Sequence, residues 1–234
     1  MININQIVKA YHGQVVLNIP ALHIPRGESV GLVGNNGAGK TTLFSLLLDL
    51  IVPDSGEIKI DGQVVFSNDS WKKITTSFLD ESFLISYLTA EEYFYFIGKL
   101  RGVNESEVDR LLEMYKDFFN DEVLGKKKYL RDLSKGNQKK VGIISTLIGD
   151  PQLIILDEPF ANLDPSTQFR LKSIIKELAS TREKTIVVSS HDLSHTVDIS
   201  DRILVLQKGV LIQDIQTSAE TLVELEAFFN QLDA

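Results

Sequence analysis

Apolar residues run almost without interruption through three short segments, and each run ends at glycine or at polar residues. The segments are 28–34 (ESVGLVG), 153–158 (LIILDE) and 185–192 (TIVVSSHD). Runs of this kind are typical of strands buried on both faces of a parallel sheet. A helical pattern over 166–179 separates the last two, and strand–helix–strand order predicts a parallel sheet with helices on its faces.

Helical and hairpin patterns fill much of the remaining chain. Residues 41–50 predict a helix that ends at the turn sequence VPDSG, and 57–66 predict a hairpin with an Asp61-Gly62 turn. From about 80 to 150 the pattern becomes helical, with Thr89 as an N-cap and with aromatic residues at helical spacing. We expect most of those aromatic side chains to pack in the core.

Composition places the chain among ordinary globular proteins. Hydrophobic residues make up 43% and charged residues 24%, and no apolar run approaches the roughly 20 residues of a membrane-spanning helix. The first residues lack the basic-then-apolar pattern of a secretion signal, and there are no cysteines. These features favour a cytoplasmic protein without disulfides.

Charge is distributed unevenly along the chain. The net charge is −8, which argues against nucleic-acid binding. Residues 126–140 are the exception, because this window contains seven basic residues and only one acidic residue, Asp132. The seven are Lys126, Lys127, Lys128, Arg131, Lys135, Lys139 and Lys140. Such a cluster is usually a solvated face, but here it surrounds a Ser/Gly turn, LSKGNQKKV, which strengthens the alternative that it attracts phosphate.

The first predicted strand leads into GNNGAGKTT at 34–42, a phosphate-binding P-loop pattern. Its glycines let backbone N–H groups turn inward around phosphates, and the helix that follows adds its positive end. Lys40 supplies a mobile positive charge, and the Thr41 hydroxyl is suited to Mg²⁺. The strand before and the helix after supply the context that this motif requires.

Polar residues end the two later strands, at the edge where open α/β sheets bind ligands. Asp157 is suited to hold Mg²⁺ through water, and Glu158 to orient or deprotonate an attacking water. His191 can hydrogen-bond a γ-phosphate oxygen. We therefore assign catalytic roles to Lys40, Glu158 and His191.

In this order, GNNGAGKTT, LSKGNQKK, LIILDEP, ANLDP and SSHD resemble the nucleotide-binding subunit of an ATP-binding cassette (ABC) transporter, over nearly the whole chain. The resemblance implies an α/β fold with a P-loop NTPase core, a mostly parallel sheet, an N-terminal antiparallel β region and an inserted helical subdomain. We expect the core at 1–79 and 151–234, with a short tail, and the helical subdomain at 80–150. The implied cofactors are ATP and Mg²⁺.

In that family the signature turn binds the γ-phosphate of an ATP that a second subunit holds. The resemblance therefore implies two half-sites on this chain, with a second copy or a paralogous subunit completing each one. It also implies a tyrosine, Tyr11, stacked on adenine and an aspartate, Asp164, in a loop that crosses the dimer interface. The residues assigned to nucleotide binding are Tyr11, Asn35, Gly37, Ala38, Gly39, Lys40, Thr41, Thr42, Ser134, Gly136, Asn137 and Asp164.

The sequence departs from the family pattern in two places. Lys135 replaces a signature glycine and Asn137 a glutamine, although the serine and the second glycine remain. The family's metal-contacting glutamine aligns with Asp80, with Glu81 beside it as the alternative. We therefore predict metal ligation by Thr41, Asp157 and Asp80, and a carboxylate at that place would alter the coupling of its loop to hydrolysis.

By this resemblance, two subunits close over two ATP, and hydrolysis reopens them to drive a separate membrane permease. The permease would dock in a groove near 79–100 lined by Phe83, Leu84, Tyr87 and Phe94. The SKG signature is similar to that of bacterial exporter subunits. We expect a cytoplasmic protein that is peripheral on the inner face of the cell membrane.

Other functions remain open at this stage. A soluble ABC-type ATPase without transport is the main alternative, although such factors normally carry two cassettes in one chain. A chromosome-type ATPase needs a coiled-coil insertion far longer than the helical stretch here. A P-loop kinase or GTPase would need an acceptor site or a guanine-reading motif, and the sequence offers neither.

Overall fold

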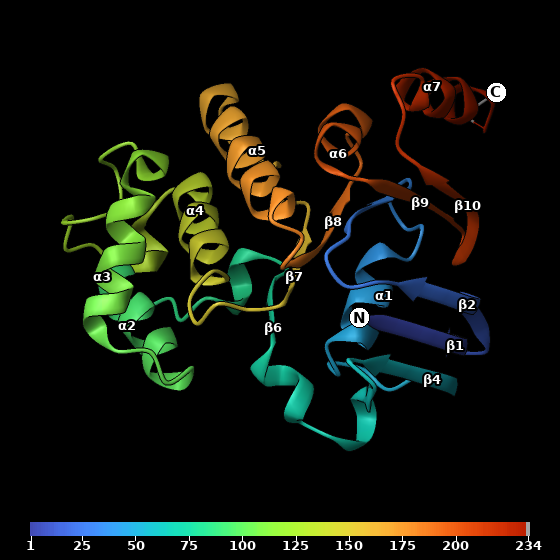
Figure 1. The fold of residues 1–234 in the computed structure, drawn as a ribbon, viewed down its shortest axis with the longest axis horizontal. Helices are drawn as coiled ribbons and strands as arrows, with labels where there is room; N and C mark the ends of the chain where they lie inside the picture. Colours follow the sequence, from blue (N-terminus) through green and yellow to red (C-terminus); the bar gives the residue numbers. More distant parts are fainter. Residues whose placement is uncertain (233–234) are drawn as a thin grey trace.

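The computed structural model describes residues 1–232, which form two sheets with helices packed around them (Figure 1). The smaller sheet is antiparallel and has the strand order β2-β1-β4-β5. Its strands are β1 (Ile2–Tyr11), β2 (Gln14–Ile24), β4 (Ser55–Ile60) and β5 (Gln63–Val64). The N-terminal antiparallel region and the hairpin at Asp61-Gly62 are thereby confirmed.

The larger sheet has the strand order β10-β9-β3-β8-β7-β6. Its strands are β3 (Ser29–Val33), β6 (Thr75–Phe78), β7 (Leu153–Asp157), β8 (Thr185–Ser190), β9 (Arg202–Gln207) and β10 (Val210–Gln216). Every neighbouring pair is parallel except β9 and β10, which are antiparallel. The three apolar runs are thus adjacent strands, and the predicted parallel sheet is confirmed.

Most helices lie on one side of the larger sheet, and α2, α3 and α4 gather at the end of the molecule opposite β1, β2 and β4 (Figure 1). The helices are α1 (Lys40–Leu47), α2 (Ala90–Leu100), α3 (Glu105–Met114), α4 (Lys135–Ser145), α5 (Pro165–Ser180), α6 (Leu193–Ile199) and α7 (Thr221–Leu232). Short 3₁₀ turns are η1 (Val65–Ser67), η2 (Ser70–Lys73), η3 (Glu81–Phe83), η4 (Lys116–Phe119) and η5 (Leu130–Asp132).

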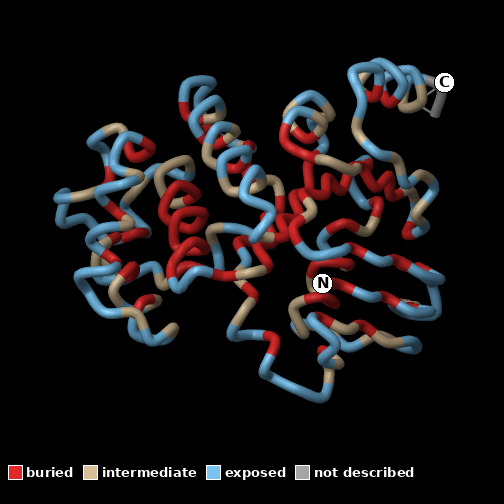
Figure 2. The backbone as a smooth tube through the Cα atoms, viewed as in Figure 1, coloured by how far each residue is buried: buried red, intermediate tan, exposed pale blue. Residues whose placement is uncertain are grey.

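The larger sheet separates two parts of the hydrophobic core. Along β7, Leu153 and Ile155 pack toward α1 and the smaller sheet, whereas Ile154 and Leu156 pack toward α4 and α5. This alternation follows from the period of two of a strand, and it buries both faces (Figure 2). Burial on both faces explains why the run is apolar throughout and becomes polar only at its end.

Side chains fix where the helices begin. Thr89 forms a capping box with Glu92 at the start of α2, as the sequence predicted. Ser134 caps α4, because its hydroxyl accepts a hydrogen bond from the Asn137 N–H at 3.2 Å. Asp164 caps α5, and proline follows it in the first turn, where its missing N–H costs nothing.

The structure differs from the sequence prediction at the end of α1 and at Phe94. The helix predicted for 41–50 ends at Leu47, since Asp49 adopts a positive φ of 58°. Phe94 was expected to line a groove, but its side chain is fully buried (0% exposed) against Phe119. Helical spacing alone could not tell whether this aromatic faces the core or the surface.

A membrane-spanning helix needs about 20 apolar residues. Within residues 1–232, none of the helices combines the length and the hydropathy that crossing a bilayer demands.

Candidate functional site

The glycine loop between β3 and α1 curls around the amino end of the helix. Gly37 and Gly39 adopt φ angles of 79° and 108°, a region that glycine alone enters without strain. Lys40 folds back over the loop, and its ammonium donates a hydrogen bond to the Gly34 carbonyl at 2.6 Å. The loop therefore keeps a positive charge and backbone N–H groups at one place.

A pocket of about 300 Å³ opens above this loop and brings most of the predicted residues together. Tyr11 enters it from the end of β1, as an exposed ring, while Asp157 and Glu158 enter from the end of β7. The full lining is Tyr11, Val16, Asn36, Gly37, Ala38, Gly39, Lys40, Thr41, Thr42, Asp157 and Glu158. Asn35 instead lines a neighbouring hollow with Lys208 and Phe229.

Asp157 is buried beside the loop and is held by two hydroxyl groups. Thr41 Oγ1 donates to its Oδ2 at 2.8 Å, and Ser189 donates to its Oδ1. Burial raises the pKa of Asp157, and these two hydrogen bonds act in the opposite direction. A buried carboxylate has lost most of its hydration, so its negative charge is stabilised by a nearby cation.

The donor atoms at this place fit Mg²⁺. A hydroxyl and a carboxylate are hard oxygen ligands, and Mg²⁺ commonly takes one or two protein ligands together with phosphate oxygens and water. Within residues 1–232, no group of three His, Cys, Asp or Glu side chains lies close enough together to hold a metal ion by protein ligands alone. Thr41 and Asp157 therefore suit a metal that arrives with a phosphate ligand.

Glu158 lies between two cationic or potentially cationic groups. Its Oε1 is 3.5 Å from Lys40 Nζ, and its Oε2 is 2.8 Å from His191 Nδ1. Glu158 thus contacts both other residues that the sequence proposed as catalytic, although the three lie at the start of α1, after β7 and after β8. Glu158 itself has a φ of 46°, a left-handed conformation that costs a residue with a Cβ about 1–2 kcal/mol.

The main chain of Glu158 is held on both sides. Its N–H donates to the Ser189 carbonyl at 3.2 Å and also lies 3.1 Å from the Ser189 hydroxyl. Its carbonyl accepts a hydrogen bond from Lys139 Nζ at 2.9 Å. No role in the catalytic pocket was predicted for Ser189 or Lys139. A hydroxyl inside an apolar strand was the available signal for Ser189.

The second Ser/Gly turn lies outside this pocket. Among the described residues, the pocket lining does not include Ser134, Gly136, Asn137 or Asp164. Gly136 packs so closely against the loop after β7 that an added Cβ would lie 2.9 Å from the Asn162 carbonyl. The signature turn and the loop that contains Asp164 therefore form a second surface of the same chain.

Asp164 is engaged by its own helix. It accepts hydrogen bonds from the Thr167 N–H at 3.0 Å, from the Thr167 hydroxyl at 2.6 Å and from Ser166 at 2.6 Å. These hydrogen bonds, with Ser166 contributing most, lower the pKa of Asp164 well below its usual value. The carboxylate is therefore fully charged at neutral pH.

Asp80 and Glu81 occupy the loop after β6, and neither belongs to the pocket lining. The Asp80 carboxylate accepts a hydrogen bond from the Ser82 N–H at 2.6 Å and caps η3. Glu81 points inward and lies 3.6 Å from Lys139 Nζ. Asp80 thus lies outside the lining of the pocket that contains Thr41 and Asp157, and Glu81 has the buried Lys139 as its partner.

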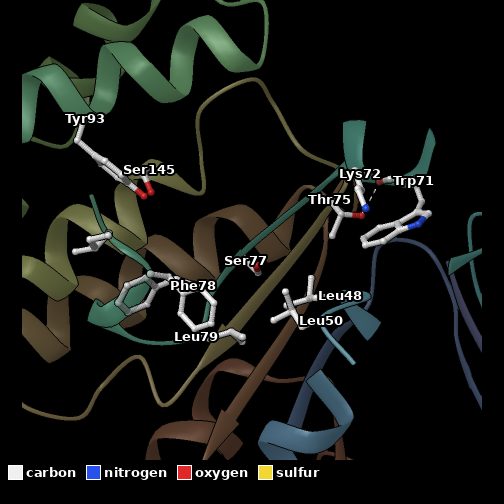
Figure 3. Close-up of a pocket in the computed structure, with 12 residues that line it drawn as sticks. Leu48, Leu50, Trp71, Lys72, Thr75, Ser77, Phe78, Leu79, Tyr93 and Ser145 are labelled. Atoms are coloured by element: carbon white, nitrogen blue, oxygen red, sulfur yellow. Dashed lines mark hydrogen bonds between the residues drawn. The ribbon is translucent and has the colours of Figure 1, made fainter. Parts of the chain in front are cut away.

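A separate apolar hollow of about 270 Å³ lies between the end of α1 and the helical segment (Figure 3). Figure 3 shows Leu48 and Leu50 on one side and Tyr93 with Ser145 on the other. Its lining is Leu48, Leu50, Trp71, Lys72, Thr75, Ser77, Phe78, Leu79, Phe83, Leu84, Tyr93 and Ser145. Of the four residues predicted to line a groove here, Phe83 and Leu84 do, and Phe83 is 58% exposed.

Residues 17–161 match the family described as ABC transporter. The bacitracin transport ATP-binding protein of Enterococcus faecalis is 33% identical over 93% of this chain and 70% of its own length. The choline transport ATP-binding protein of Bacillus subtilis is 30% identical over 91% of this chain. This chain spans 57% of that protein and a similar share of several other curated relatives that it matches.

Solved structures resemble the whole chain. The ATP-binding subunit of an ABC transporter superimposes with a TM-score of 0.87 and 25% identity, covering 100% of both chains. A dimeric bacterial ABC transporter cassette gives a TM-score of 0.82 with 27% identity, covering 94% of this chain and 100% of the other. The P-loop NTPase fold predicted from the motifs is thereby confirmed.

Proposed function

Because this chain belongs to the ABC transporter family and is an ATP-binding domain of that family, we propose that it works as half of a head-to-tail dimer. In this dimer ATP is hydrolysed between the two copies, and the cycle drives a separate membrane permease. The family assignment makes the domain an ATPase. The observation that supports the rest is the separation of Ser134 from the pocket that contains Lys40 and Glu158.

In the proposed cycle, Tyr11 stacks on the adenine ring of ATP. Backbone N–H groups of residues 37–42 surround the phosphates, and Lys40 leaves the Gly34 carbonyl to contact them. Thr41 and Asp157 would hold Mg²⁺, which offsets phosphate charge when it is bound. Ser134 and Gly136 of the partner copy cover the γ-phosphate from the opposite side.

Glu158 then accepts a proton from the attacking water, and His191 hydrogen-bonds a γ-phosphate oxygen. Both roles agree with the contact between His191 and the pocket residue Glu158, because the imidazole can orient the carboxylate until phosphate arrives. Hydrolysis removes the phosphate that bridges the two copies. The proposed result is reopening of the dimer, with residues 80–150 moving against 1–79 and 151–234.

The permease would dock in the apolar hollow of Figure 3. Exposed Phe83 and the leucines at the end of α1 offer a surface that a short helix could bury. Such docking would place the chain on the inner face of the cell membrane. We propose export as the direction, since the Ser134-Lys135-Gly136 signature is similar to that of bacterial exporter subunits.

Phosphate release and membrane association test this function. The chain is expected to release free phosphate from Mg–ATP, and Lys40→Ala to abolish release by removing the contact to phosphate. The chain is also expected to purify from its own cells with a permease, and Phe83→Asp to detach it while leaving phosphate release intact. A chain that hydrolyses ATP but never associates with a membrane subunit indicates the soluble ATPase instead.

A further inference from the structure

Helix α4 contains two lysines whose side chains are almost completely buried. Lys139 is 4% exposed and Lys140 is 2% exposed, although both belong to the basic stretch that the sequence assigned to phosphate attraction. A buried ammonium is unfavourable unless oxygen atoms compensate its charge. Lys140 is compensated by Glu122, which is 3.3 Å away. The two lysines are therefore unavailable to phosphate.

Lys139 has partners of a different kind. Its Nζ donates to the main-chain carbonyl of Glu158 at 2.9 Å and lies 3.6 Å from Glu81 Oε1. The Glu81 side chain is only 12% exposed, and its Oε1 has no hydrogen-bond partner within residues 1–232. The carboxylate thus compensates the ammonium by charge, which leaves the hydrogen bond to Glu158 as the directional contact.

The contact is made at a residue whose backbone is in the left-handed region. Glu158 adopts a φ of 46°, and residues with a Cβ keep such a conformation only when their surroundings enforce it. The backbone angles at this residue determine where its carboxylate points. The carbonyl on one side is held by Lys139, and the N–H on the other side is held by Ser189.

We propose that Lys139 is a positioning residue of the hydrolytic site, a role that rests on the function proposed above. It holds the main chain of Glu158 so that the carboxylate faces the pocket, and it joins this residue to two other elements. One is α4, whose first residue follows Ser134, and the other is the loop that contains Glu81. Because a helix moves as a rigid rod over so few residues, a displacement at Ser134 displaces Lys139 as well.

Lys139→Met tests this role, with Lys140→Met as the matched control from the same helix. Both variants remove one buried ammonium, so both are expected to lower the thermal stability by similar amounts. Only Lys139→Met is expected to lower kcat for phosphate release, by roughly tenfold or more, because small displacements of a catalytic group are costly. The KM for ATP is expected to stay within about twofold, since the P-loop is untouched.

Two further variants keep the test decisive if Lys139→Met does not fold. Lys139→Arg retains a charged donor and is expected to keep more of kcat than Lys139→Met. Glu81→Gln removes the compensating charge and is expected to lower kcat with an unchanged KM. When Lys139→Met and Glu81→Gln are combined, the loss of kcat is expected to be smaller than the sum of the two single losses, because both substitutions act through one contact.

The results separate the two proposals. If the unmodified chain releases no phosphate, the proposed function fails. If it does, and Lys139→Met keeps the full kcat or loses no more than Lys140→Met, then Lys139 has only a structural role and the inference is overturned. If Lys139→Met misfolds and aggregates, Glu81→Gln decides the question. A full kcat in Glu81→Gln then overturns the inference.

Discussion

Glu158 is the residue at which the proposed chemistry and the backbone conformation meet. Its two carboxylate oxygens contact Lys40 and His191, the same groups that the proposed cycle assigns to phosphate. A γ-phosphate entering the pocket would compete for both contacts. Nucleotide binding would therefore release the carboxylate, which then becomes free to act on water.

The substitution Glu158→Gln tests this role. The amide keeps the size of the side chain and can still hydrogen-bond, but it cannot accept the proton. ATP binding is expected to be retained, and phosphate release to fall by roughly 10²–10⁴-fold, the usual contribution of a general base. Nucleotide binding by fluorescence and phosphate release by absorbance are the two measurements. Release near the wild-type rate would mean that another group accepts the proton.

Asp164 provides a prediction for the dependence of stability on pH. Its pKa is lowered in the folded chain, so its contribution to stability is complete above the unfolded pKa of about 3.9 and is lost as the pH falls through the folded value. At pH 7, Asp164→Ala is expected to lower the free energy of unfolding by about 1 kcal/mol, the usual loss of a helix cap.

Urea unfolding at pH 7 and at pH 3 checks the sign. The difference between Asp164→Ala and the wild type is expected to shrink at the lower pH, where protonation begins to remove the advantage of the aspartate. A difference that is equal at both pH values would show that the charge of this carboxylate contributes nothing.

At the scale of elements, the sequence predicted best those segments whose pattern reflects burial on both faces. The apolar runs correctly predicted β3, β7 and β8, because such runs bounded by turns are typical of strands buried on both faces. Since these strands are parallel, the residues that follow them, among them Lys40, Asp157 and Glu158, lie together in the pocket. β6 (TTSF) was missed because it is a short edge strand with polar residues. The β9–β10 pair and α7 follow the last recognised motif, and no prediction had been made for them.

The parts of the site that were missed depend on contacts between distant segments. Lys139 looks like one more charge in a basic stretch, and only the packing of α4 against the end of β7 gives it Glu158 as a partner. The same packing was needed to see that Glu81 faces inward while Asp80 caps a 3₁₀ turn. Such pairings depend on tertiary structure, which no local pattern specifies.

The junction of α4 and β6 yields a prediction at this scale. A Cβ added to Gly142 would lie 2.1 Å from the ring of Phe78, so the helix and the strand approach as closely as glycine allows. Gly142→Ala is expected to lower the free energy of unfolding by about 1–3 kcal/mol through overpacking, despite the better helix propensity of alanine. Urea unfolding is the measurement, and adding Phe78→Leu is expected to restore part of the loss. A stabilised Gly142→Ala variant would show that the ring moves away freely.

At the scale of the whole molecule, the proposed dimer requires each chain to present halves of two different sites. The pocket contains Lys40, whereas Ser134 caps a helix elsewhere on the surface. In a two-fold dimer the pocket of each copy would meet the Ser134 turn of the other copy, so two copies would complete two sites. The geometry therefore predicts complementation between variants that are damaged in different halves.

Mixing Lys40→Ala with Ser134→Ala tests this arrangement. Each variant alone makes dimers in which both sites lack one group, and both are expected to be nearly inactive. In a mixed dimer, one site combines the intact Lys40 of one copy with the intact Ser134 of the other, and phosphate release is expected to return. Mixing two preparations of Lys40→Ala is the control. If each chain held a complete site of its own, mixing would restore nothing.

The strand order of the larger sheet also constrains when a newly made chain can become active. β3, which leads into the glycine loop, lies between β8 and β9, and its Ser29 pairs with Ile186. At ribosomal rates of about 5–20 residues per second, the interval between the synthesis of these partners is on the order of 10 s. During that time the antiparallel sheet can form, but β3 lacks both lateral neighbours. A nascent polypeptide is therefore expected to capture nucleotide only after β8 and β9 have left the ribosome and have paired with β3.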